Sequence, residues 1–158
     1  MKKILIFLVI ISAIFIVPPS VIFAAEPPLI DQAIWSETTK DKVFNACLAA
    51  VTMVGYAVDP LGTNKDIGLI ITKPISFNYK YRDDIVCYYT LQIVVTEIQH
   101  NKVMVNVNAV DKNYDWKSYN PGESVMQGYF DNKIAPDFQK FFAQIDNVLG
   151  KAESYRKK

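Results

Sequence analysis

The sequence of 158 residues has few of the residue types from which catalytic and metal sites are built: two cysteines, one histidine and six glycines. The histidine, His100, falls in a predicted hairpin turn, whereas a His-based triad needs a nucleophile and an orienting acid beside it. One histidine and two cysteines are too few for a zinc tetrad. No glycine-rich loop precedes a predicted helix, so no phosphate-binding loop is indicated. We expect neither a metal nor a cofactor.

The chain also lacks an excess of charge of one sign, with 17 Lys and Arg against 16 Asp and Glu. Lys2 and Lys3 stand in an N-terminal segment that we expect to be removed, which leaves 15 basic against 16 acidic residues. A near-neutral domain has no electrostatic reason to bind nucleic acid or acidic lipid. The partner is therefore expected to be of another class.

The N-terminal segment MKKILIFLVIISAIFIVPPSVIFAA has the layout of a secretory signal peptide over residues 1–25: a basic start, an apolar run and small residues at the end. An uncleaved anchor is the alternative. Pro18 and Pro19 oppose it because they interrupt the apolar run, which is short for a bilayer span. We predict a periplasmic or secreted protein, without a stable membrane anchor unless the signal is uncleaved.

Two amphipathic helices frame the rest of the chain. The first is predicted from Thr38 to a stop at Gly55, and the closing helix over residues 134–149. We expect a leader segment over 26–37, one domain over 38–150 and a basic tail over 151–158.

Strands are predicted between the helices. Residues 85–96 and 103–109 alternate apolar and polar side chains on either side of the turn QHNK, which is the pattern of a long antiparallel hairpin. Shorter strands are expected at 67–73 and 75–81, and another at 125–130. The predicted fold class is α+β, an antiparallel sheet of four to five strands with both helices packed on one face.

The two cysteines both point toward the predicted core. Cys47 shares the apolar stripe of the first helix, and Cys87 shares the inward face of the hairpin. Exported compartments are usually oxidising, so we predict a disulfide between them. Two separate buried thiols that pack as small hydrophobic groups are the alternative.

Carboxylates occur in three pairs at loops, where turn formation is the favoured interpretation. A small hydrolase would need side chains from these pairs to converge in a cleft. The pairs are Asp59 with Asp66, Asp83 with Asp84, and Asp111 with Asp115.

Aromatic residues beside polar ones mark the best candidate binding surface, because partner and ligand sites favour this combination. The alternative is a loop that folds its rings over an open end of the core. The candidate binding residues are Tyr114, Trp116, Tyr119 and Tyr129. The outer face of the hairpin is a second candidate surface, formed by Tyr88, Thr90, Gln92, Met104, Asn106 and Asn108.

The passage CLAAVTMVGYAVDPLGTNKDIGLIIT at residues 47–72 contains a helix ending in Gly-Tyr and a Gly-x-Ile-x-Thr strand start, at Gly68, Ile70 and Thr72. It resembles uncharacterised exported bacterial domains and, more distantly, the helix-grip domains of BamC-like envelope lipoproteins. The resemblance implies a fold and a cell-envelope location but no catalytic residues. This chain lacks the lipidation cysteine of the lipoprotein members.

We therefore expect an exported, non-enzymatic domain that binds a protein or a cell-envelope component. Two alternatives remain: a small carboxylate-dependent hydrolase, and a small-ligand carrier. The carrier would need a cavity between helices and sheet beneath Phe138 and Phe142.

Overall fold

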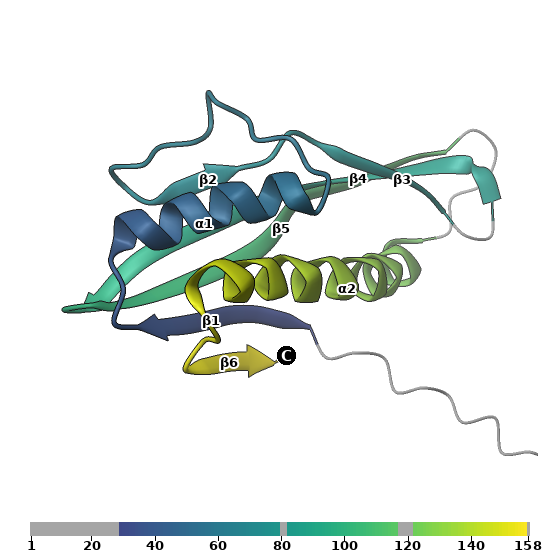
Figure 1. The fold of residues 1–158 in the computed structure, drawn as a ribbon. Helices are drawn as coiled ribbons and strands as arrows, with labels where there is room; N and C mark the ends of the chain where they lie inside the picture. Colours follow the sequence, from purple (N-terminus) through teal and green to yellow (C-terminus); the bar gives the residue numbers. More distant parts are fainter. Residues whose placement is uncertain (1–28, 80–81, 117–121, 158) are drawn as a thin grey trace, which may run out of the picture.

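The protein is an α+β domain with one antiparallel sheet and two helices, as predicted (Figure 1). The computed structural model describes residues 29–79, 82–116 and 122–157, so the predicted signal peptide lies outside the described residues. The elements, in chain order, are β1 (Ile30–Ser36), α1 (Lys40–Met53), β2 (Leu69–Ile71), β3 (Ile75–Tyr79), β4 (Arg82–Gln99), β5 (Lys102–Trp116), α2 (Glu123–Leu149) and β6 (Ser154–Lys157).

The long hairpin predicted from the alternating residues is the centre of the sheet. β4 and β5 pair from Ile85 opposite Trp116 to Gln99 opposite Lys102. The strand order is β2-β4-β5-β1-β6, and β3 pairs with another part of β4 on the same side as β2. All these pairings are antiparallel.

Both helices lie on one face of the sheet, side by side (Figure 1). This inner face carries the inward residues of the hairpin, and the two helices bury their apolar stripes against it. Among the described helices, neither is long and apolar enough to cross a membrane. The largest side chains that the core encloses almost completely are Tyr89, Phe138, Phe141, Phe142, Ile70 and Ile85.

The sheet has six described strands instead of four to five, because two segments outside the predicted domain join it. β1 comes from the predicted leader and β6 from the predicted tail, and they pair with each other. Arg156 of β6 donates two hydrogen bonds to the buried Asp31 of β1, at 2.9 and 3.0 Å. The indole of Trp35 donates to the carbonyl oxygen of Gly150 at 3.0 Å. These contacts fix both chain segments to the domain.

The prediction of a strand at 125–130 is wrong, because this segment forms the beginning of α2. Met126, Phe130, Ile134 and Phe138 recur every four residues, and all four are at most 3% exposed. The apolar stripe of the closing helix therefore starts well before residue 134.

The predicted disulfide is not present, since Cys47 and Cys87 are free, buried thiols. The position of α1 along β4 separates them. Gly68 lies between Lys40, the first residue of α1, and Val95 of β4: a Cβ on Gly68 would contact both the Lys40 side chain and the Val95 carbonyl oxygen. The start of α1 is therefore near Val95. Beyond the other end of α1, Tyr56 bonds to Tyr89 of β4. Cys47 is in the middle of the helix, whereas Cys87 lies beyond Tyr89, so the thiols occupy different layers of the core.

Candidate functional site

Half of the central strand β5 has a free edge. β1 pairs with β5 only from Ser36 opposite Lys102 to Gln32 opposite Asn106. Beyond that point, no strand in the described part of the chain pairs with residues 107–116 on this edge, although β4 pairs with them on the other. Every second residue of such an edge directs its N–H and C=O groups outward, where they can accept another strand.

A β-bulge shapes this free half of β5. Thr90 of β4 is opposite Val110, and Tyr88 is opposite Asn113, so two residues of β5 lie opposite one residue of β4. Asp111 has φ of 52°, which is the left-handed conformation that the bulge requires. Because one extra residue exchanges the two faces, the bulge places Lys112 on the inner face, where a regular strand would place Asp111.

A cleft of about 250 Å³ opens beside this edge, between β5, the start of β1 and α2. We call it the edge cleft. Its apolar lining comes from the inner face of β5, from the residue before β1 and from α2, where Phe138 itself is only 2% exposed. Asn108 lies at the rim and is exposed. The apolar lining residues are Leu29, Val107, Ala109, Ile134 and Phe138.

Two carboxylates line the edge cleft, and each is paired with a cation. Lys112 lies 2.9 Å from Asp131, which also accepts hydrogen bonds from Gln127 at 3.0 and 3.1 Å. Asp31 is 2% exposed and takes both hydrogen bonds from Arg156, and this carboxylate raises the pKa of the Arg156 guanidinium. Such a two-bond contact between arginine and a carboxylate fixes the orientation of both groups. The cleft is therefore lined by apolar and polar side chains in equal number, and its charged side chains are paired.

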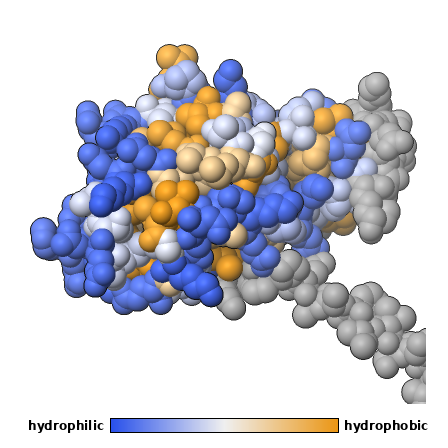
Figure 2. Space-filling model, viewed as in Figure 1, coloured by the Kyte–Doolittle hydropathy of each residue, from blue (hydrophilic) through white to orange (hydrophobic). Residues whose placement is uncertain are grey.

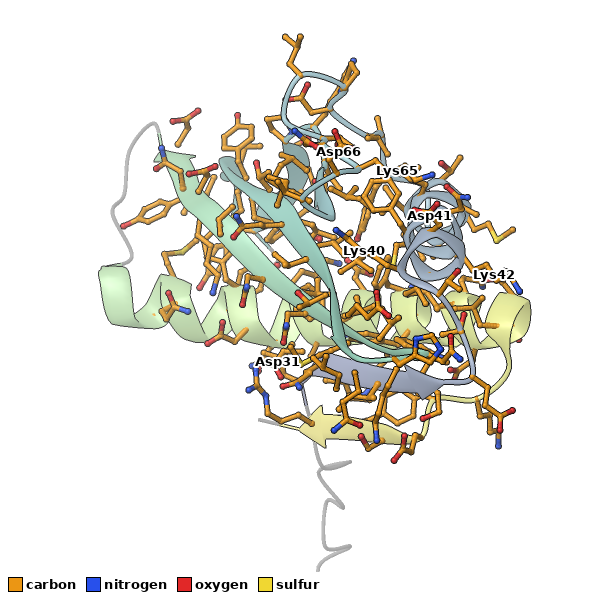
Figure 3. The ribbon with its side chains drawn as sticks, turned by 90° about the vertical axis from the view of Figure 1, so that its left-hand side faces the viewer. Asp31, Lys40, Asp41, Lys42, Lys65 and Asp66 are labelled. Carbon is orange, nitrogen blue, oxygen red and sulfur yellow. The ribbon has the colours of Figure 1, made fainter. Side chains whose placement is uncertain are left out.

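Figure 3 shows Asp31 beside β1 and β6, away from a second charged group around the start of α1. In that group Lys65 lies 3.5 Å from Asp41, and the Lys40 ammonium donates to the carbonyl oxygen of Asp66 at 2.7 Å. These side chains are largely exposed, and such ion pairs contribute little to stability. Their role is to position the loop that leads into β2.

The three predicted carboxylate pairs do not form the edge cleft. Asp59 and Asp66 belong to the loop after α1, where Asp59 accepts a hydrogen bond from the amide of Leu61 at 3.0 Å. Asp111 and Asp115 are exposed along β5. The side chains of Asp83 and Asp84 lie outside the described residues.

Two of the predicted aromatic binding residues have side chains that the structure describes, and they come from different elements, Tyr114 from β5 and Tyr129 from α2. Tyr129 is on α2, where its ring packs edge to face on Tyr79 with centroids 4.5 Å apart. It also contacts Phe77, at 5.9 Å. Tyr114 is half-buried on the inner face, opposite Cys87 in the hairpin register. These two rings cover the end of the core, which is the alternative interpretation of the aromatic pattern. Tyr119 and the side chain of Trp116 lie outside the described residues, so their predicted role stays a prediction.

A polar cluster joins the two helices to the sheet. The hydroxyls of Tyr56 and Tyr89 lie 3.1 Å apart, and both donate to the same carboxylate oxygen of Asp137 on α2. Burial, followed by the hydrogen bond to Asp137, raises the pKa of Tyr56. Burial also raises the pKa of Tyr89. Because one carboxylate oxygen of Asp137 accepts hydrogen bonds from both neutral phenols, the cluster links the segment after α1, β4 and α2, and its role is structural.

Two other features of the surface bear on chemistry. Across residues 29–79, 82–116 and 122–157, no group of three or more His, Cys, Asp or Glu side chains is placed to hold a metal ion. Apolar surface gathers where α1 and α2 meet (Figure 2). A second hollow of about 380 Å³ lies there, lined by Lys42, Asn45, Ala46, Ala49, Val148 and Leu149.

Comparisons with known proteins leave the family open. No family model and no curated protein matches the chain. Among solved structures, the chain is similar to the adenylate sensor of AMP-activated protein kinase, crystallised in complex with 5-aminoimidazole-4-carboxamide 1-beta-D-ribofuranotide. That match has 13% identity and a TM-score of 0.42, and it covers 70% of this chain and 94% of the sensor. A likeness at this level carries no functional argument.

Proposed function

We propose that the protein is an exported, non-enzymatic binding domain, periplasmic or secreted, whose edge cleft takes an extended segment of a protein partner. The free edge of β5, beside a cleft that offers an apolar wall and paired charges, is the observation that carries this proposal. An extended peptide adds to such an edge through main-chain hydrogen bonds, and pockets next to the edge select its side chains. The N-terminal segment supports export because it has the layout of a signal peptide.

The size of the edge cleft favours a peptide over a small-molecule ligand. Pockets for small molecules usually enclose about 300–1,000 Å³. The edge cleft has about 250 Å³, and Phe138 fills the space below it. A space of this size suits one apolar anchor side chain of a partner, which is how most binding energy is concentrated in protein interfaces.

The charges around the cleft support binding rather than acid–base catalysis. Asp31 and Asp131 each have a cationic partner within 3.0 Å. A general acid or base must be free to exchange a proton with a substrate, whereas both carboxylates are held by a neighbouring cation. We expect the anchor side chain to be uncharged, because both charged pairs at the cleft are already satisfied.

Peptide selection tests the proposed function. A phage-displayed library of unstructured peptides is selected on the native protein, and the enriched peptides are measured by fluorescence anisotropy against variants. Ala109→Leu fills the cleft from the inner face of β5 and is expected to abolish binding. Asn45→Ser, at an exposed position of α1 that does not line the edge cleft, is the control and is expected to bind normally. If Ala109→Leu binds the enriched peptides as tightly as the native protein does, the edge cleft is not the peptide-binding site.

A further inference from the structure

The outer face of the sheet, away from both helices, has an unusual composition (Figure 1). Open faces of antiparallel sheets normally carry polar and charged side chains in contact with water. In the described part of β1, β2, β4 and β5, the central outward positions hold no charged residue, although Arg156 of β6 lies opposite Gln32 in the register. They are Gln32, Ile34, Leu69, Ile71, Thr90, Gln92, Val94, Thr96, Met104, Asn106, Asn108 and Val110.

Four side-chain amides adjoin one another on this face, and we call them the carboxamide patch: Gln32, Gln92, Asn106 and Asn108. Gln32 of β1 is opposite Asn106 of β5, and Gln92 of β4 is opposite Asn108 of β5. Directly opposed residues of an antiparallel pair have Cβ atoms roughly 4.5–5.5 Å apart, and diagonal neighbours are about 7–8 Å apart. The four amides therefore form one continuous group across three adjacent strands.

Most of the hydrogen-bonding capacity of the patch is unused by the protein. The amide of Gln32 donates to the sulfur of Met104 at 2.7 Å. Within the described ranges, the side chains of Gln92, Asn106 and Asn108 make no hydrogen bond to another residue. Each carboxamide offers two donors and an acceptor oxygen with two lone pairs. The patch is thus a neutral surface that can donate and accept at several neighbouring points.

We propose that the carboxamide patch binds a neutral glycan that bears hydroxyl and acetamido groups. Hydroxyl and acetamido groups both donate and accept hydrogen bonds, as carboxamides do, and they bring no charge onto an uncharged face. Nucleic acid and anionic lipid would need free cations here, and the guanidinium of Arg156, opposite Gln32, is already bound to Asp31. Tyr88 shares this face, about 13 Å along β4 from Gln92, and its half-buried ring gives the apolar side of a sugar a surface to pack on. This site adjoins the proposed peptide site, because Asn108 also lies at the rim of the edge cleft.

A titration with the N-acetylglucosamine hexamer, followed by two-dimensional NMR, tests the proposal. We expect the side-chain amide signals of Gln92, Asn106 and Asn108 to shift on binding. The double variant Asn106→Ser, Asn108→Ser removes two sets of hydrogen bonds and is expected to bind about tenfold more weakly. Asn45→Ser, an exposed amide on α1, is the matched control and should bind as the native protein does. An unchanged melting temperature shows that the double variant is folded.

Other occupants of the patch give different results. Shifts of the same amides on concentrating the protein alone would identify a second copy as the occupant and overturn the proposal. So would shifts confined to Leu29, Ile134 and Phe138 of the edge cleft, or equal affinity of the native protein and the double variant for the hexamer. Loss of peptide binding in Ala109→Leu with intact glycan binding would separate the two sites.

Discussion

Filling the edge cleft should stabilise the protein, and the substitution that tests this is Ala109→Leu. Ala109 is half-buried on the inner face of β5, opposite Leu91, and it lines the cleft. Leucine adds three carbon atoms, each worth about 0.8 kcal/mol when fully buried, or roughly 2.4 kcal/mol in all. Because position 109 is only half-buried, we expect about 1 kcal/mol of added stability.

Ala50→Leu is the matched control for this prediction. Ala50 is fully buried in α1 and lines neither the edge cleft nor the hollow where α1 and α2 meet. The same added atoms have no space there, and overpacking costs about 1–3 kcal/mol. The two variants should therefore differ in the sign of their effect.

Urea unfolding measures both variants, with tryptophan fluorescence as the signal, to which the buried Trp35 contributes. The free energy of unfolding extrapolated to water should rise for Ala109→Leu and fall for Ala50→Leu, with an unchanged dependence on urea. If Ala109→Leu loses as much stability as Ala50→Leu, the space beside β5 is not open to a side chain, and the proposed anchor site is refuted.

Three further predictions follow from the same contacts. Gly55→Ala should lower the free energy of unfolding by about 1–2 kcal/mol, because φ is +89° at this position. Gly68→Ala should lower it clearly more, since the added Cβ would also lie 2.2 Å from the carbonyl oxygen of Val95. Thermal unfolding compares the two variants, and equal losses of stability would contradict the close approach at Gly68. Tyr89→Phe removes one hydroxyl from the cluster of Tyr56, Tyr89 and Asp137, and it should lower the free energy of unfolding in urea by about 1–2 kcal/mol. No change would mean that this cluster does not stabilise the fold. Burial raises the pKa of Cys87 from 9.0 to about 11 and that of Cys47 as well, so their contribution to stability is complete below pH 9 and is lost as the pH rises toward 11. The urea midpoint should fall over this range, and less in the variant with both cysteines replaced by alanine; identical falls would rule the thiols out as a cause.

The parts of the fold that depend on local patterns could be predicted from the sequence. The hairpin follows from strict alternation, and α1 follows from its stripe and its caps. β6 could not be predicted, because its pairing with β1 joins residues more than a hundred positions apart and its composition is that of a solvated tail. β1 carried a readable signal: Asp31 shares its inward face with Trp35, and a buried carboxylate there requires a cation.

The edge cleft itself depends on two features that the sequence hides. The first is the length of β1, which ends its pairing with β5 at Asn106. The second is the bulge at Asp111, which moves Lys112 onto the inner face beside Asp131. A bulge at a polar Asp-Lys-Asn stretch can be suspected only once the register on both sides is known. The aromatic pattern was the stronger sequence signal, and the described rings of that pattern pack on the core.

Hydrogen exchange along β5, measured by NMR without any ligand, tests the free edge most directly. Residues 102–106 lie between β4 and β1, so all their amides should exchange slowly. Over residues 107–116, every second amide should exchange fast, because it points to the edge that no described strand occupies, while its neighbours bonded to β4 stay protected. Slow exchange at every amide from 102 to 116 would contradict the account, since a strand partner would already occupy the site.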